Sequence, residues 1–508
     1  MKRPHVEVNL GELDQMLDRA CEAPLSQTDS AKIKNALHTL AEVLAARRTT
    51  EKTREVLGDA AAQPAELPGQ PAPAKDERAK TPGHGRHAAS SYEGARKVVV
   101  THPELQHGDR CPECGSGNVY EQKESKPLVR IVGQAPLSAN IYELQRLRCN
   151  GCGQVFTAPE PSGVGTEKFD ETAGAMIAQL KYGSGMPFAR IEELEQRLGI
   201  PLPASTQWEI VEEVAELAKP ARDELIRQAA SGGLFHNDDT GMRVLKMERP
   251  PGDKRTGVFT SGIVSVGERR RVALFFTGRE HAGENLGAVL AERAADLPAP
   301  VQMCDALSRN TPKLDGGVEL LVANCLTHGR RQFVELVGAF PGQCRFVLET
   351  LGRVYANDAE ARAGGLLAGE RLRLHQERSG PLMESLREWF DEQIRERKAE
   401  PNSGLGKAIQ YFQRHWKALT LFLRQPGAPL DNNVCERALK RAVLHRKNAL
   451  FYRTLHGAEV GDLFMSLIHT CELNTVNSFD YLVALQRNAD ALARSPQDWM
   501  PWNFAQNL

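Results

Sequence analysis

The sequence lacks long apolar runs and is poor in cysteine. No apolar run approaches the ~18 residues that a membrane-spanning helix requires, and no apolar segment follows the positively charged MKRPHVEVNL, as a secretory signal would need. Ten cysteines among 508 residues are too few for a disulfide scaffold. Four of them form two Cys-x-x-Cys pairs, which is typical of metal binding in a reducing compartment. We therefore expect a cytoplasmic protein without membrane segments.

Acidic residues are scarce between residues 401 and 450. This segment has nine Lys and Arg residues but only two acids, Asp431 and Glu436, which gives a net charge of +7. In the stretch LDNNVCERAL an Asn could cap a helix, and Glu436 could favour the first turn electrostatically. Alternatively, Glu436 could bind a metal ion while the basic residues around it bind phosphate. The segment alone leaves both interpretations open.

The remaining composition is that of an ordinary soluble globular protein, with 41% hydrophobic and 25% charged residues. At 508 residues the chain is long enough for about three or four domains. The net charge of −1 identifies no class of partner, because local charges differ strongly from it.

The amino-terminal part of the chain divides into a helical region and a linker. Between residues 7 and 57, Leu and Ile recur at steps of three and four, which predicts amphipathic helices or a short coiled coil in a region 1–58. These helices could pair two chains or pack on their own chain, and both interpretations stay open. Residues 59–95 contain five prolines, many alanines and mixed charges, so we expect a linker there.

Two Cys-x-x-Cys-Gly motifs, CPECG and CNGCG, follow in residues 96–160. Each motif is a tight turn that lets two thiolates face one ion, and two such turns supply a tetrahedral set for Zn²⁺. We expect a structural zinc ribbon in which 34 residues separate the two pairs, with a redox role as the alternative. The predicted zinc ligands are Cys111, Cys114, Cys149 and Cys152.

Residues 161–230 have a helical pattern with a turn at GIPLPAS, where Ser205 or Thr206 could cap the second helix. Two helices joined in this way suit a helix-turn-helix that contacts DNA, although such helix pairs also occur in other roles. DNA binding by this segment is therefore one of two open interpretations.

The hydrophobic period changes to that of strands after residue 230. GLFHNDDTGMRVLKM, GVFTSGIVSV and RRRVALFFTG predict three antiparallel strands, GENLGAVLAERAAD a crossover helix, and PVQMCDALS a parallel strand that ends at Asp305. This order is that of a ribonuclease-H-like core, which we expect to begin in residues 231–345. In that fold an Asp on the first strand and an Asp at the end of the fourth lie side by side, where they can bridge two divalent cations. Asp238 and Asp239 are the candidates on the first strand.

A third carboxylate at such a site normally comes from a helix that packs against the sheet. Residues 346–425 are highly charged and helical in pattern, so we expect an all-helical insertion into the core. Glu436 lies just beyond it, in a region 426–508 that also contains the carboxyl-terminal helices. This order of segments favours Glu436 as a metal ligand.

Several stretches together resemble a known family. The chain is similar to the DDE transposases of the insertion-sequence-sixty-six family, and the similarity runs in order through nearly the whole chain. The specific blocks are Asn-Asn-x-x-Glu-Arg-Ala and Arg-Lys-Asn, because the cysteine pairs and helices alone would not identify the family. The stretches are CPECG, RCNGCG, NDDTGMRVL, NCLTHGRRQF, LGKAIQYFQRHWKAL, LDNNVCERALKRAVLHRKNALF and LIHTCELN.

The resemblance implies cleavage and strand transfer of DNA by three carboxylates with Mg²⁺ (or Mn²⁺). The Asp-Glu-Thr motif of the family reads Asp238-Asp239-Thr here, so Asp238 is the matching position and Asp239 replaces the Glu. Asp305 and Glu436 match the second Asp and the Glu. The aromatic residue that usually follows the second Asp is missing, and Cys435 stands where Ala is commoner.

The same resemblance implies DNA as the partner, at the element ends and at the target. We expect a homo-oligomer, with accessory proteins of the same element as possible partners, and a structural role for His328. Basic side chains near the presumed site would contact phosphates and add salt-dependent affinity, unless they belong to a solvated helix surface. They are Arg330, Arg331, Arg437, Lys440, Arg441, Arg446 and Lys447.

The sequence thus predicts a multidomain α+β DNA transposase. Helical segments and a zinc ribbon precede a ribonuclease-H-like catalytic core with a helical insertion. One alternative is a related nuclease such as a junction resolvase, which would cut branched DNA without joining ends. The other is a catalytically inactive, DNA-binding regulator.

Overall fold

The computed structural model describes most of the chain and divides it into two compact units. One unit is Glu66–Ser138, and the other combines Met1–Ala65 with Ala139–Leu508. Most of the predicted amino-terminal helices and of the linker lies outside the described residues. The described residues are 53–57, 89–92, 95, 97–122, 127–152, 154–165, 167–248, 252, 255–314 and 319–508.

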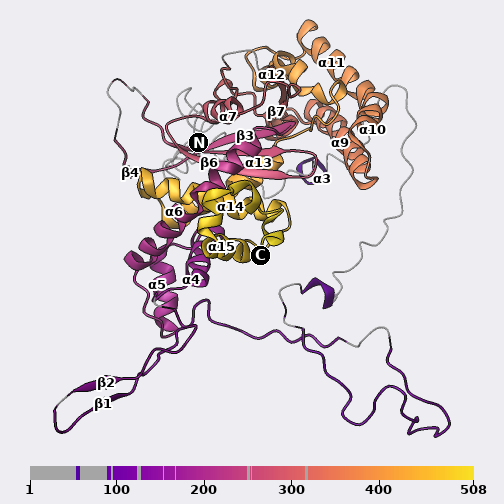
Figure 1. Cartoon of the computed structure of the whole chain (residues 1–508). Helices are drawn as coiled ribbons and strands as arrows, with labels where there is room; N and C mark the ends of the chain where they lie inside the picture. The colour runs from indigo at the N-terminus through magenta and orange to yellow at the C-terminus, as the bar shows by residue number, and fades with distance from the viewer. Residues whose placement is uncertain are drawn as a thin grey trace, which may run out of the picture. The chain divides into compact units, whose positions relative to one another are not determined.

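A five-stranded mixed sheet lies within the larger unit (Figure 1). Its strand order is β6-β5-β3-β7-β8, in which β3, β5 and β6 are antiparallel neighbours and β7 and β8 run parallel to β3. Helix α7 (Ala282–Ala291) connects β6 to β7. Three antiparallel strands, a crossover helix and a parallel strand are the order that the sequence predicts. The strands are β3 (Leu234–Gly241), β5 (Phe259–Val266), β6 (Arg271–Gly278), β7 (Val301–Cys304) and β8 (Leu321–Asn324).

Helices cover both faces of the sheet at its centre. All residues of β5 between its two ends are buried, so the strand lacks the apolar–polar alternation of a half-exposed strand. On one face, a Cβ atom at Gly262 would lie 2.9 Å from Leu439 of α13 (Asn433–Ala449). On the other face, Ser261 accepts a hydrogen bond from Asn285 of α7 (2.9 Å). The sheet is therefore sandwiched between α13 and α7.

Helix α14 (Leu455–Leu473) closes the edge of the sheet at β6. Three alternate backbone N–H groups of β6, from Ala273 to Thr277, donate to side chains of α14 at 3.0, 3.0 and 2.6 Å. An exposed edge strand is a site for unwanted pairing with another chain, and these side chains occupy its donors. The acceptors lie one helical turn apart and are Thr470, Ser466 and Asp462.

Asp462 should make the stability of the fold depend on pH. Burial raises the pKa of its carboxyl to about 7, so the folded chain holds this proton to higher pH than the unfolded chain does. Stability therefore falls as the pH rises between about 4 and 7. Asp462→Asn cannot ionise, and we expect it to gain stability relative to the wild type from pH 5 to pH 8, by roughly 1.4 kcal/mol per unit of pKa shift. Urea unfolding at the two pH values measures the gain.

Thr470→Val is the matched control for this experiment. It removes the α14 side chain that accepts from the N–H of Ala273 in the same edge strand, and it removes no titrating group, so it should destabilise the chain equally at both pH values. A stability difference between Asp462→Asn and the wild type that is the same at pH 5 and pH 8 would contradict the prediction.

Helices occupy the region in which the sequence predicts a helical insertion. Side chains of β7 and β8, such as Met303 and Ala323, belong to the same buried cluster as these helices, so the cluster continues the core from the parallel side of the sheet. The helices of this region are α9 (Pro341–Ala363), which begins just before it, α10 (Ala368–Leu374), η5 (His375–Ser379), α11 (Gly380–Arg395), α12 (Gly404–Leu419) and η6 (Leu421–Leu423), and α8 (Leu326–Leu336) precedes them.

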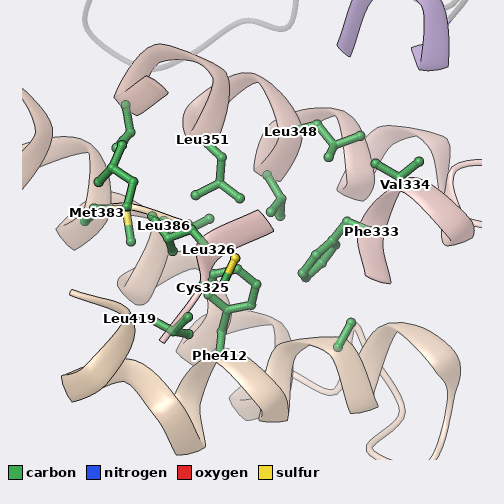
Figure 2. Close-up of a cluster of buried hydrophobic side chains, with 14 of the residues drawn as sticks. Cys325, Leu326, Phe333, Val334, Leu348, Leu351, Met383, Leu386, Phe412 and Leu419 are labelled. Carbon is green, nitrogen blue, oxygen red and sulfur yellow. The ribbon is translucent and has the colours of Figure 1, made fainter. Parts of the chain in front are cut away.

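Three phenylalanine rings meet in this cluster. Phe333 of α8 stacks against Phe390 of α11 with ring centroids 5.9 Å apart, and it meets Phe412 of α12 edge-on at 5.8 Å. Figure 2 shows Phe333 and Phe412 among the aliphatic side chains around them. A Cβ atom at Gly329 would lie 2.6 Å from the Phe412 ring, so this glycine lets α8 and α12 approach closely.

The described turn of the predicted amino-terminal helices packs on its own chain. In α3 (Thr53–Leu57), Val56 and Leu57 are buried in the helical cluster, and Thr53 accepts a hydrogen bond from Arg330 (3.2 Å). For the residues of α3, this contact agrees with the interpretation that the amino-terminal helices pack on their own chain. Residues 7–52 lie outside the described residues, so the predicted dimerisation element stays a prediction.

The segment predicted to resemble a helix-turn-helix is helical, but its predicted cap is wrong. The second helix begins after Pro203, so Ser205 and Thr206 fall inside its first turn. The backbone N–H of Ala204 donates instead to Glu192 of the preceding helix (3.2 Å). The elements are α4 (Glu171–Ala178), η3 (Gln179–Gly183), α5 (Phe188–Arg197) and α6 (Ala204–Ala229).

Short elements complete the described part of the chain. Strands β1 and β2 form an antiparallel pair, and β4 pairs with β9 in parallel. None of the described helices combines the length and apolar character needed to cross a bilayer. The short elements are η2 (Ala89–Ser91), β1 (Arg146–Arg148), β2 (Val155–Thr157), β4 (Val244–Lys246), β9 (Tyr452–Thr454), α15 (Ser478–Arg487), α16 (Ala489–Arg494), η7 (Pro496–Trp499) and η8 (Phe504–Gln506).

Candidate active site

Parallel pairing of β3 with β7 places two of the predicted carboxylates side by side. His236 pairs with Met303, and continuing this register by two residues brings Asp238 next to Asp305, directly after β7. Asn310 of η4 (Ser308–Asn310) donates from its side-chain nitrogen to Oδ1 of both, at 3.1 and 2.6 Å. The two carboxylates therefore lie within two hydrogen bonds of each other.

Asn310 is itself held by buried amides. Its backbone carbonyl accepts hydrogen bonds from the side chains of Asn237 and Gln302, both at 2.7 Å, and Gln302 also donates to Asn237 (2.8 Å). All three amide side chains are fully buried. Our sequence analysis did not single them out, although an Asn and a Gln inside apolar strands are a signal that could have been used.

The surroundings of Asp238 disfavour its negative charge. Burial, followed by the charge of Asp305, raises the pKa of Asp238 to about 7. A carboxylate pair with this much uncompensated charge is the kind of site that a divalent cation stabilises.

Asp239 faces the opposite side of the sheet. Its carboxylate accepts a hydrogen bond from His281, the residue before α7 (2.8 Å), and pairs with Arg309 (3.3 Å). Successive residues of a strand point to opposite faces, so only one of two neighbouring aspartates can join Asp305. Asp238 has that position.

Helix α13 carries Glu436 in its first turn and is anchored to the sheet by Asn432. The Asn432 side chain makes no capping hydrogen bond; it donates to the backbone carbonyl of Asn237 (3.0 Å) and contacts His236 (3.0 Å). The capping interpretation of the Asn-Asn pair is therefore wrong for this side chain. Asn432 instead fixes the start of the helix over the strand that carries Asp238.

A close contact one turn further along brings the same helix down on the sheet. Cys435 donates its thiol hydrogen to the carbonyl of Gly262 (3.2 Å), the residue paired with Asp238 on the neighbouring strand. Burial, followed by the charges of Asp238 and Glu436, raises the pKa of this thiol. Cys435 therefore lies near both carboxylates, on the face of the sheet that α13 covers.

Glu436 has unsatisfied ligand capacity. Its Oε1 atom is buried without a hydrogen-bond partner and lies 4.0 Å from Nδ1 of His328, which is also buried and unpaired. Ligand atoms of Cys325, His328 and Glu436 lie within 4.8 Å of one another, and in the described part of the chain the three carboxylates do not form a group that tight. Nitrogen and sulfur ligands suit transition metals rather than Mg²⁺. Burial raises the pKa of the Cys325 thiol to about 11, and we assign no ion to this set.

Comparison with known proteins identifies the family. The model of the family described as "Transposase IS66 family" matches residues 168–460, which is more than half of the chain and includes all three carboxylates. The chain belongs to the IS66 transposase family. Two relatives are uncharacterized proteins of Sinorhizobium fredii. The protein y4jD is 26% identical, and the match covers 80% of this chain and 80% of y4jD. The protein y4hP is 24% identical, and the match covers 80% of this chain and 75% of y4hP. No solved structure matches.

Four of the seven basic residues predicted to contact DNA in this IS66-family chain have partners inside the chain. Arg330 is buried and bonds Thr53 (3.2 Å). Arg441 pairs with Glu472, and Arg446 donates to Thr240 (3.0 Å) and to the carbonyl of Gly241. These contacts hold the side chains of Arg330, Arg441 and Arg446 within the fold. Arg331 is half-buried on α8 and also interacts within the chain.

The remaining three form an exposed stripe on α13. Arg437, Lys440 and Lys447 are exposed, and their spacing of three and seven residues puts them on one side of the helix. We call these three residues the basic stripe. It begins next to Glu436.

The four cysteines predicted to bind zinc fall in two units of the IS66-family chain. Cys111 and Cys114 belong to the smaller unit, where the N–H of Gly115 closes a turn on the carbonyl of Cys111 (2.9 Å). The pKa of the Cys114 thiol is lowered to about 6, mainly by hydrogen bonding to Ser116. Cys149 and Cys152 lie in the larger unit, in the turn between β1 and β2. A joint zinc site therefore stays a prediction.

Proposed function

We propose that this chain is a DNA transposase that cleaves DNA strands and joins them to a target with two divalent cations. In this proposal Asp238, Asp305 and Glu436 hold the cations on a ribonuclease-H-like core. The observation that carries it is the pair of carboxylates joined by Asn310, with Glu436 on the helix that covers the same face. Membership of a transposase family supports DNA as the substrate.

The residues present fit Mg²⁺ or Mn²⁺. Carboxylate oxygens are the ligands that such hard cations prefer, and Glu436 Oε1 is buried without a donor. When bound, two such ions activate an attacking oxygen and stabilise the leaving oxygen of an in-line phosphoryl transfer. Asn310 would keep Asp238 and Asp305 together, while Asn432 and Cys435 would hold Glu436 above them.

The test is an assay that separates cleavage from joining. Full-length protein is incubated with Mg²⁺ and a plasmid that carries the inverted repeats flanking its gene, and cut and joined products are resolved. We expect both products. Cut branched DNA without joined products would favour a junction-resolving nuclease, and tight binding without any cutting would favour an inactive regulator.

The basic stripe should supply phosphate contacts. Each phosphate neutralised by a cationic side chain contributes about 0.9 to the slope of log K against log salt concentration. We expect the triple variant of Arg437, Lys440 and Lys447 to Gln to lower this slope by about two to three. Fluorescence anisotropy from about 50 to 200 mM salt measures it.

Lys417→Gln is the control for the stripe, because Lys417 is an exposed lysine on α12. Its slope should equal that of the wild type. A triple variant with an unchanged slope would show that the stripe is only a solvated helix surface.

The proposed transposase would also contain a zinc site and act as an assembly. The four cysteines would hold a structural Zn²⁺, and transposition would require a homo-oligomer, because two DNA ends must be paired. Accessory proteins of the same element would complete the assembly.

A further inference from the structure

A pocket of about 930 Å³ lies away from the three carboxylates, between η3, α5, α6, β9 and the last turns of α13. Its volume is within the range of sites that enclose a small molecule or a nucleotide. None of the three carboxylates lines it. Five aromatic side chains do so, which are Tyr182, Phe188, Trp208, Phe451 and Tyr452.

A buried lysine lines this pocket. Lys181 is only 6% exposed, and its ammonium lies 4.8 Å from the centre of the Phe188 ring and 5.9 Å from that of Tyr182. Among the described residues, no carboxylate pairs with it and no acceptor bonds it. Burial lowers its pKa to about 8, so it remains mostly cationic at neutral pH. A buried cation without a counter-charge is unfavourable, and an anion in the pocket would compensate it.

A second buried group faces the same pocket without a partner. His445 is 4% exposed, and its Nε2 atom has no hydrogen-bond partner. Its ring stacks on Tyr452 with centroids 4.2 Å apart. Nε2 can therefore donate to, or accept from, a polar ligand that stacks among these rings.

The rim of the pocket carries charges of both signs. Lys246 and Arg453 are exposed there. Of the acids, Glu209 is exposed, and Glu212 is bonded to His456 (2.8 Å). The exposed cations Lys246 and Arg453 suit an anionic chain that leaves the pocket. Lys181 is the buried cation among the residues that line it.

The turn that delivers Phe451 to the pocket is strained. Leu450 has φ of +69°, a conformation that favours glycine, and the N–H of Phe451 bonds the carbonyl of Ala449 two residues back (2.8 Å). Such a turn is rare for a branched residue and occurs mainly where function requires it. Here it joins the end of α13 to β9.

We propose that this pocket binds one unpaired nucleotide of the DNA substrate, with its base among the aromatic rings and its phosphate against Lys181. Every base has a face that stacks on aromatic side chains, and a phosphate matches a buried ammonium. Glu436 and His445 are nine residues apart on α13, about 14 Å at 1.5 Å per residue. A short DNA duplex is therefore long enough to reach both positions on this helix. The inference rests on the proposed function only in taking DNA as the ligand.

The test compares two DNA duplexes that differ in one unpaired base. Full-length protein is titrated, with EDTA to prevent cleavage, with a fully paired duplex and with the same duplex carrying one extrahelical 2-aminopurine. We expect the second duplex to bind about tenfold more tightly, because one base stacked on aromatic side chains contributes about that factor or more. Lys181→Met and Trp208→Leu should each remove most of this preference. Because two pocket variants are used, the test still gives a result if one of them fails to fold.

Lys219→Met and Trp389→Leu are the matched controls and should keep the tenfold preference, since neither residue lines the pocket. Equal binding of the two duplexes by the wild type would overturn the proposal, as would a preference that survives in both pocket variants. Competition by free dAMP without any preference for the extrahelical base would assign the pocket to a free nucleotide and overturn the DNA source. The preference is measured without cleavage, so it can stand or fall independently of the carboxylate chemistry.

Discussion

Changing Glu436 to Gln should abolish metal-dependent DNA cleavage and leave DNA binding intact. The buried Oε1 atom of Glu436 has no hydrogen-bond partner, so its charge is available to a cation, and an amide would lose that charge. We expect the same loss for Asp238→Asn and Asp305→Asn, because each change also removes one negative charge from the carboxylate pair that Asn310 joins. Losing one ligand of a two-cation site removes several kcal/mol of transition-state stabilisation, and about 4 kcal/mol corresponds to a thousandfold in rate. Cleavage rates with Mg²⁺ and anisotropy with EDTA measure the two properties separately.

Asp239→Asn is the control, because it changes the neighbouring carboxylate on the opposite face. Asp239 bonds His281 and Arg309, and an Asn of the same size can keep a hydrogen bond to His281. We expect cleavage to fall by less than about tenfold, that is by less than about 1.4 kcal/mol. Loss of cleavage in Asp239→Asn together with activity in Asp238→Asn would show that the first carboxylate is assigned to the wrong residue.

The strands and their order could be predicted because the hydrophobic period of the sequence changes sharply after residue 230. The sequence also predicted part of the arrangement of side chains on the strands. Strand alternation predicts that Asp238 and Asp239 point to opposite faces, and the structure places them so. In the sequence only the family resemblance distinguishes Asp238 from Asp239. In the structure, the pairing of β3 with β7, which are far apart in the sequence, places Asp238 next to Asp305.

Roles that depend on distant partners could not be predicted. Arg441 and Arg446 lie in the basic segment like Lys440, but they bond Glu472 and Thr240, which only the tertiary structure brings near. Asn432 has the sequence signature of a helix cap, and the sheet below it offers its side chain a different partner. Local sequence therefore predicted charge and helix position here but not which side chains stay available to DNA.

The pocket shows the same limit in another form. Lys181 and His445 lie far apart in the sequence, on η3 and α13. Neither stands in a motif that indicates a ligand. Their joint significance comes from burial without a partner, which only the folded chain shows.

Asn310→Leu should lower cleavage by about a hundredfold and move the acid limb of its pH profile to higher pH. The Asn310 side chain donates to Asp238 and Asp305 at once, and its hydrogen bond lowers the pKa of Asp238 against the effects of burial and of the neighbouring charge. Without that donor the charged form of Asp238 is less favourable, so its pKa rises further. A carboxylate must be ionised to bind a cation, and a higher pH is then needed for activity. The loss of a preorganised donor to charged groups is typically about two to three kcal/mol, or about a hundredfold.

The pH profile separates positioning by Asn310 from a merely structural role. Asn324→Ala is the matched control, because this buried amide donates to the backbone carbonyl of Asp305 (3.3 Å) and not to its carboxylate. Both variants lose a buried amide and should lose stability in urea unfolding. The acid limb of the cleavage rate, measured from pH 5.5 to 8.5 at saturating Mg²⁺, should move only in Asn310→Leu. A lowered rate with an unmoved acid limb would assign Asn310 to the support of η4 alone, and the carboxylate pair would then depend on the strand register of β3 and β7 for its spacing.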